Sequence, residues 1–366
     1  LRKNCMNITI AHRMRPFSHK MGSVFLLPNS HFKVELFPTL LRFTDLENRI
    51  EPLEIRLFIR GPIQSFTVEL DLETGSICVF GSTLDGYIRY SLFYKASKLL
   101  LLCEKTPSTL QLQYGSTLSQ LKPKQTLAIP VPFCLESQGL QERLHLGIHK
   151  AQDWELVQRR FNLQEIFPFW LALAQWVPSI AYEDNDQGMF LLIHKCQRAI
   201  EKKEKLQIIN CFKNVFLAAF EGVFVPRLFD SDYQGIIDLE EKALPAVALL
   251  LQSAKLLRRL FFVEEENLFS ILPCVPPELH CGRIIQLQTT KLDRIDIEWS
   301  KKRLHRLFIQ TSSTRPVICQ LPKEISSCRL RVHRKDKGQK LQVANEGTLQ
   351  IPALAHAKAW LDRFEK

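Results

Sequence analysis

The chain has 366 residues, of which 46% are hydrophobic and 24% are charged. This balance is typical of a globular protein, and domains of roughly 100–200 residues allow two or three of them. It excludes a fibrous or largely disordered chain. The formal net charge is +11, which bears on partners rather than on the fold, because a basic surface attracts anions.

The ten cysteines show no CxxC pair and no regular spacing. Several lie in apolar runs, where a free cysteine behaves as a small buried hydrophobe. We therefore expect reduced thiols and a cytoplasmic location. Cys274, His280 and Cys281 lack a fourth ligand at zinc-finger spacing, and no cofactor motif is present. We expect neither a metal nor a cofactor.

Residues 1–21 form a basic N-terminal segment, and the apolar run that follows at residues 24–27 is too short for a signal peptide. No segment reaches the roughly 18 apolar residues that a membrane-spanning helix needs, so no transmembrane segment is expected. The sequence starts with Leu1 rather than Met, which leaves open that it is a fragment of a longer chain.

Residues 22–145 are predicted to form a β-sandwich. The clearest stretch, residues 66–94, alternates apolar and polar side chains and carries turn signals at residues 73–75 (ETG) and 85–86 (DG). An Asp-Gly pair between alternating segments predicts a hairpin. Several short strands at this spacing favour two packed sheets.

Residues 146–265 are predicted to be a helical region. Apolar residues recur there at helical spacing in about five segments. These segments are residues 151–161, 167–177, 189–205, 211–224 and 243–262.

Residues 266–366 are predicted to be a linker followed by a C-terminal β domain. The linker contains a proline-rich break at residues 272–282, which cannot continue a helix. Short alternating runs then return, and Trp299 in one of them is expected to pack in a sandwich core, the alternative being a platform on which a sugar stacks. The fold class is therefore multidomain α and β, with an N-terminal β-sandwich, a central α-helical bundle and a C-terminal β-sandwich.

Two stretches of the chain resemble the ends of the α-L-fucosidase family of inverting glycoside hydrolases. Residues 70–74 (LDLET), followed by the hairpin at 85–86, are similar to its N-terminal supersandwich. Residues 250–253 (LLQS) are similar to its last barrel helix, the ILPCVP segment at residues 271–276 to its linker, and the DIEW strand at residues 296–299 to its C-terminal β domain. The linker departs from the family's Leu-Leu-Pro-x-x-Pro pattern at Ile271.

The resemblance implies a catalytic (α/α)6 barrel, for which the middle of the chain is short. Twelve helices of about 11–12 residues with their connections need on the order of 180 residues. About 110 residues lie between the sandwich and the linker. We therefore expect a partial α/α toroid, completed only if a second copy or a longer chain supplies the rest.

The catalytic candidates are acidic residues in two predicted loops of this middle region. Inverting glycosidases place two carboxylates roughly 6.5–9.5 Å apart, one protonated and one activating water. Asp230 and Asp232 are the candidate acids, with Glu183 or Asp186 facing them. The alternative is that both segments are ordinary polar turns, since Asp and Ser favour turns by bonding to local backbone.

Four residues of the helical region are candidates for substrate binding. Trp154, Trp170 and Trp176 could provide an aromatic floor for a sugar, and Asp153 precedes the first of them. The alternative for Asp153 is an acid at a helix N-terminus, where the helix dipole favours it.

A basic stretch carries most of the positive charge. Residues 301–340 contain twelve Lys and Arg against two acids, Glu324 and Asp336. Within it, residues 329–340 are predicted to form an exposed hairpin with a turn near Gly338. Its candidate anion-binding residues are Arg329, Arg331, Arg334 and Lys335. The alternative is a solvated basic face without a partner.

These observations lead to one expected function and two alternatives. We expect a glycoside hydrolase-like protein that is degenerate and without catalysis, with a carbohydrate-related binding or structural role. The first alternative is an active glycosidase, completed by oligomerisation or belonging to a longer chain. The second is an interaction module that binds nucleic acid or an acidic glycan through its basic C-terminal sheet. The sequence indicates no oligomeric state.

Overall fold

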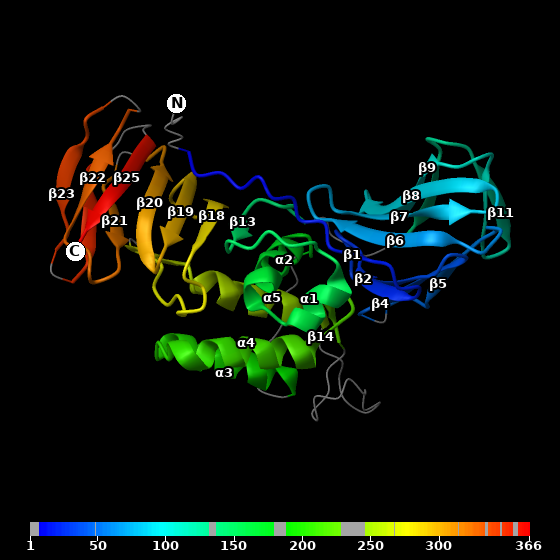
Figure 1. Cartoon of the computed structure of the whole chain (residues 1–366), viewed down its shortest axis with the longest axis horizontal. Helices are drawn as coiled ribbons and strands as arrows, with labels where there is room; N and C mark the ends of the chain where they lie inside the picture. Colours follow the sequence, from blue (N-terminus) through cyan, green and yellow to red (C-terminus); the bar gives the residue numbers. More distant parts are fainter. Residues whose placement is uncertain are drawn as a thin grey trace.

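The computed structural model describes residues 7–47, 49–131, 137–178, 188–227, 246–266, 268–313, 315–333, 336–344, 346–353 and 358–366. Two groups of predominantly antiparallel sheets lie at opposite ends of the molecule, with helices between them (Figure 1). In the described ranges, no helix is both long and apolar enough to cross a lipid bilayer.

The N-terminal β-rich part consists of two six-stranded antiparallel sheets, as the alternating pattern predicts. The first contains β1 (Phe17–Ser18), β6 (Gln64–Asp71), β7 (Ser76–Thr83), β8 (Gly86–Lys95), β9 (Lys98–Lys105) and β12 (Thr126–Pro130). The second contains β11 (Thr117–Leu121), β10 (Leu110–Tyr114), β5 (Leu53–Leu57), β4 (Leu40–Asp45), β3 (Phe32–Leu36) and β2 (Ser23–Leu26). Alternate side chains are buried, as along β3, where Phe32, Val34 and Leu36 lie in the core.

The two turns predicted inside this part are confirmed. β7 and β8 pair as far as Thr83 and Gly86, so a two-residue turn of Leu84 and Asp85 joins them directly, with Gly86 as the first residue of β8. Gly75, between β6 and β7, has a φ of +66°, a conformation that residues with a Cβ rarely adopt. Hairpins of this kind are local, so their sequence signals suffice to specify them.

Five helices occupy the middle of the described chain, and each overlaps one of the five predicted segments. They are α1 (Trp154–Arg160), α2 (Leu163–Gln175), α3 (Met189–Glu201), α4 (Lys205–Ala219) and α5 (Ala246–Arg259). α2 and α4 begin four and six residues earlier than expected. α2 packs against α5, and α3 packs against α4. A short ribbon of β14 (Phe220–Glu221) and β15 (Val225–Pro226) follows α4.

The C-terminal β-rich part has a seven-stranded sheet and a four-stranded sheet. The larger contains β13 (Arg143–His145), β18 (Gly282–Leu287), β19 (Arg294–Ser300), β20 (Arg303–Gln310), β25 (Lys358–Glu365), β22 (Ser327–Arg331) and β23 (Gln339–Gln342). The smaller contains β16 (Phe262–Glu265), β17 (Leu268–Ile271), β21 (Val317–Gln320) and β24 (Thr348–Ile351). Trp299 is buried, and its Nε1–H donates to the Leu279 carbonyl at 2.8 Å, as a core tryptophan should.

The strand pairing departs from the boundaries expected from sequence. β1 precedes residue 22 but pairs with β6 in the N-terminal sheet. β13 lies before residue 146 but pairs with β18 in the C-terminal sheet. β16 begins before residue 266 and belongs to the four-stranded sheet. An alternating pattern predicts a strand but not its partner, and the partner decides to which sheet the strand belongs.

An extended N-terminal strap, residues 7–16, runs between the two β-rich parts (Figure 1). At one end the Thr9 carbonyl accepts a hydrogen bond from Arg283 of β18 at 3.1 Å. At the other end the Pro16 carbonyl accepts from the Leu70 amide at 2.8 Å. Ile8 and Met14 are buried, so the strap adds apolar contacts as well as hydrogen bonds.

Candidate functional site

A pocket of about 420 Å³ lies where α2 and α5 meet the segment before β13. Its floor is apolar and is provided mainly by one face of each helix. The floor residues are Leu171, Ala174, Val177, Leu251 and Ala254. A pocket of a few hundred cubic ångströms with an apolar floor and a polar rim has the size and character of a small-molecule site.

Gln175, in the last turn of α2, fixes one edge of this pocket. Its Oε1 accepts hydrogen bonds from the amides of Gln141 at 2.9 Å and Glu142 at 2.7 Å. Its Nε2–H2 donates to the carbonyls of Glu142 at 2.9 Å and Leu171 at 3.0 Å. One side-chain amide therefore holds the backbone of residues 141–142 against α2.

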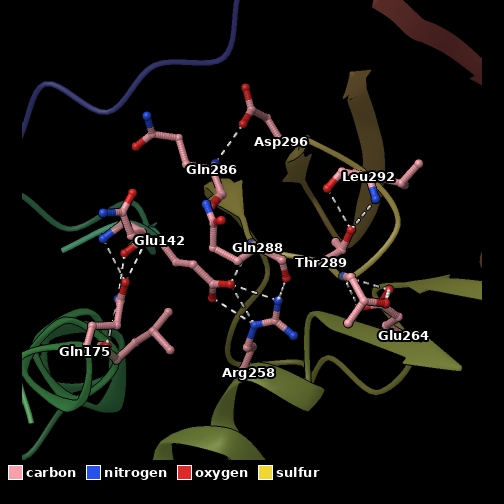
Figure 2. A network of polar contacts seen from close by, with 12 residues as sticks. Glu142, Gln175, Arg258, Glu264, Gln286, Gln288, Thr289, Leu292 and Asp296 are labelled. Carbon is pink, nitrogen blue, oxygen red and sulfur yellow. Dashed lines mark hydrogen bonds and ion pairs between the residues drawn. The ribbon is translucent and has the colours of Figure 1, made fainter. Parts of the chain in front are cut away.

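Glu142 is buried, and it is held by an arginine from α5. Arg258 Nε lies 3.0 Å from Glu142 Oε1 and 2.8 Å from Oε2, and Arg258 Nη2 lies 2.8 Å from Oε1. The amide of Gln288 also donates to Glu142 Oε1, at 2.8 Å. Figure 2 shows the carboxylate between Arg258 and the backbone of Gln288. Two-pronged pairing of this kind is strong and directional.

The same network continues into the C-terminal sheet (Figure 2). The Gln286 amide donates to Asp296 Oδ1 at 2.8 Å, where the register of β18 and β19 shifts. Arg294 pairs with the same carboxylate at 2.7 Å. Asp296, the acid of the DIEW strand, therefore stabilises an irregularity in the sheet.

The pocket rim carries several side-chain amides but one acid. Gln138, Gln141 and Gln288 line it, and each carries both hydrogen-bond donors and an acceptor. Among the described residues of the lining, Glu142 is the single carboxylate, and both of its oxygens are engaged by Arg258. The arrangement suits recognition of a polar, hydroxyl-bearing ligand. Within the described lining, it does not offer the pair of carboxylates that glycoside hydrolysis requires.

The predicted catalytic acids Asp230, Asp232 and Glu183, with Asp186, lie outside the described residues. Their roles stay predictions.

The tryptophans proposed as a sugar-binding floor do not line this pocket. Trp154 and Trp170 are buried and surrounded by phenylalanine rings, so neither exposes a face. Trp176 is half-buried, and its ring lies over Gly75 and Gly139. Asp153 is the N-cap of α1 and accepts a hydrogen bond from the Leu156 amide at 3.2 Å, which agrees with the alternative interpretation.

The basic hairpin forms as predicted, but its arginines are not free. β22 pairs with β23, and Gly338 has a φ of +82°. Arg329 and Arg331 have only 22% and 17% of their side chains exposed, and both pair with Asp362 of β25. Burial would raise the pKa of Asp362, but the Arg329 hydrogen bond and the Arg331 charge outweigh it and lower the pKa. The anion-binding hypothesis loses the free charge on which it depended, and Arg334 and Lys335 lie outside the described residues.

Three histidines gather where the strap crosses β13. The ring centroids of His145 and His149 are 4.4 Å apart, and that of His12 is 5.6 Å from His145. Burial, reinforced by the charges of His149 and His12, lowers the pKa of His145 to about 4. No group of His, Cys, Asp or Glu in the described ranges is arranged to hold a metal ion.

Sequence reasoning did not single out Glu142, Gln175 or Arg258. Glu142 lies in a polar segment without a motif, and Arg258 looks like an ordinary cation in the last turn of a helix. They are 116 positions apart, so no local pattern relates them.

The sequence matches no family model and no curated protein.

Proposed function

We propose that this chain is a carbohydrate-binding protein of glycosidase-like architecture that does not hydrolyse its ligand. The pocket between α2 and α5 would hold the sugar. The resemblance of the two ends to the fucosidase-type family supports the carbohydrate part of the proposal. The succession of β sheets, helices and β sheets is compatible with it.

One observation carries the non-catalytic part. Glu142, the carboxylate in the described pocket lining, is locked by Arg258 and by the Gln288 amide. A general acid must be able to give up a proton to the ligand, and a general base must be able to accept one from water. A carboxylate whose oxygens are already paired is poorly placed for either task.

The rest of the pocket supports binding. A volume of about 420 Å³ accommodates a small saccharide. The apolar side chains of Leu171 and Leu251 suit the C–H faces of a sugar ring, and the amides of Gln138, Gln141 and Gln288 suit its hydroxyl groups.

Saturation-transfer NMR and titration calorimetry with L-fucose, D-galactose and D-glucose test this proposal. Leu251→Trp should fill the pocket and weaken binding of the recognised sugar at least tenfold. Leu217→Trp, on the exposed face of α4 where Leu217 is 58% exposed, is the matched control and should leave the affinity unchanged. Absence of binding to every sugar, or equal affinity in the two variants, would overturn the proposal.

Turnover of aryl glycosides separates the two parts of the proposal. We expect none from the chain at any protein concentration. Hydrolysis that appears as the protein associates, and is lost in Asp232→Asn, would support the first alternative, in which a second copy completes an active glycosidase.

A further inference from the structure

A second and larger hollow lies between the turn that joins α3 to α4 and the C-terminal sheets. This groove has a volume of about 900 Å³. The proline-rich linker lines it, and the turns after β19 and β21 form part of its rim. It shares no lining residue with the pocket between α2 and α5.

Four lysines from three separate segments surround the groove. Lys203 and Lys205 flank the start of α4, Lys302 lies in the β19–β20 turn, and Lys323 follows β21. Their side chains are exposed, and none makes a hydrogen bond or ion pair with another residue of the described ranges. Glu324 and Glu346 also line the groove, so the lysines exceed the carboxylates by two and the lining has net positive charge.

The wall between these lysines is apolar but not aromatic. Leu272, Pro273, Val275 and Pro277 are half-buried and line it. The ring that borders the groove, Trp299, is buried and occupied by core contacts. Single-stranded nucleic acids stack their bases on exposed aromatic faces, whereas aliphatic and proline surfaces suit aliphatic side chains. The lining therefore fits a peptide better than a nucleic acid.

The turn that carries Lys302 is held in a costly conformation. Lys301 and Lys302 have φ of +50° and +63° and connect β19 directly to β20. Two-residue hairpin turns with positive φ at both positions strongly prefer Asn-Gly. Residues kept in such conformations are often functional. Here the strained turn positions Lys302 on the rim of the groove.

We propose that this groove binds an acidic peptide segment that carries apolar side chains between its carboxylates. The lysines attract the carboxylates and speed the encounter, while the linker wall receives the aliphatic side chains. The proposal is independent of the carbohydrate pocket, since the two share no residue.

Fluorescence anisotropy tests it with a fluorescein-labelled peptide of sequence (Asp-Leu-Glu-Pro)3. The Lys302→Glu/Lys323→Glu variant should weaken binding at least tenfold. Its matched control, Lys105→Glu/Lys122→Glu, makes the same charge change on exposed lysines of the N-terminal sheets and should change the affinity less than twofold. Replacing both Leu and Pro by Ser in the peptide should also weaken binding, because the peptide then loses its apolar contacts with the linker residues that line the groove.

A second variant separates binding from folding. Lys301→Asn/Lys302→Gly gives the turn its preferred residues, so it should raise the temperature midpoint of unfolding. It should still weaken binding of the acidic peptide, because Lys302 is lost. If this variant is more stable but binds the peptide with unchanged affinity, Lys302 does not contribute to the site.

Three results would overturn the proposal. The first is no binding of the acidic peptide. The second is binding that both charge-reversal pairs reduce equally. The third is tighter, Lys302-dependent binding of a twelve-nucleotide oligothymidine, which would assign the groove to nucleic acid.

Discussion

Arg258, in the last turn of α5, holds both carboxylate oxygens of Glu142, which directly precedes β13. Because Glu142 also accepts from the Gln288 amide after β18, one ion pair joins a helix, the segment that enters the C-terminal sheet and a loop of that sheet. Arg258 further lies over the Phe262 ring at 5.1 Å. The pair is placed to fix how the helices contact the sheet.

Arg258→Ala should therefore destabilise the fold by about 3 kcal/mol, because it leaves the buried Glu142 without its partner. Urea unfolding of the variant gives this value. The control is Arg60→Ala, which breaks an exposed pair with Asp85 and should cost less than about 0.5 kcal/mol. Adding Glu142→Leu to Arg258→Ala should recover part of the loss. A loss of under about 1 kcal/mol for Arg258→Ala would contradict the assignment.

Asp153→Ala should cost about 1 kcal/mol, the usual effect of removing an N-cap. Asp153→Asn keeps the side-chain oxygen that caps the helix and should reduce the free energy of unfolding by only about 0.3 kcal/mol. Thermal unfolding of both variants is the measurement. If Asp153 bound a ligand through its charge, the two variants would lose ligand affinity equally, whereas we expect neither to change it.

Trp170→Ala should destabilise the protein by about 4 kcal/mol, since it removes a fully buried ring. It also removes the hydrogen bond from Nε1 to Ser253 Oγ, which is 3.0 Å long. Leu206→Ala, on an exposed side chain of α4, should change stability by less than about 0.5 kcal/mol. Equal stability of the two variants in urea would exclude a core role for Trp170.

Acid should weaken the fold through His145. The pKa of this ring is lowered to about 4 by burial and by the charges of His149, His12 and Arg283, while an unfolded histidine has a pKa of about 6.5. Between these pH values the unfolded chain binds a proton that the folded chain does not bind. The free energy of unfolding is therefore not reduced by His145 above pH 6.5, and it falls as the pH decreases toward 4. The limiting slope for one proton is about 1.4 kcal/mol per pH unit, and solvent contact of the ring reduces it.

His145→Asn tests this dependence, because its side-chain oxygen can still accept the Gly147 amide that now donates to Nδ1 at 3.2 Å. The variant should show a flatter stability profile between pH 4 and 6.5 than the original chain. His305→Asn, at an exposed position of β20, should keep the original slope. An unchanged slope in His145→Asn would rule out this histidine as the source.

Local patterns in the sequence were sufficient for elements whose partners are adjacent. β6, β7 and β8 follow one another through short turns, and the helices follow from apolar spacing, so their contacts lie within reach of a short window. The position of Trp299 in a core followed from the same alternation.

The candidate site could not be obtained in this way. The pocket depends on Gln175, Glu142 and Arg258, which come from three segments and show no shared motif. Arg329 and Arg331 were misjudged as free because their neutralising partner, Asp362, lies on a strand more than thirty positions away. Charge counted along a chain does not reveal pairing across a sheet.

The position of β13 at the edge of the C-terminal sheet has a consequence for synthesis on the ribosome. Leu144 pairs with Ile284, so the strand is made about 140 residues before its partner. At roughly 5–20 residues per second, β13 waits about 7–28 s with its backbone groups unpaired. The strand can therefore take its place in the sheet only after all five described helices have been synthesised.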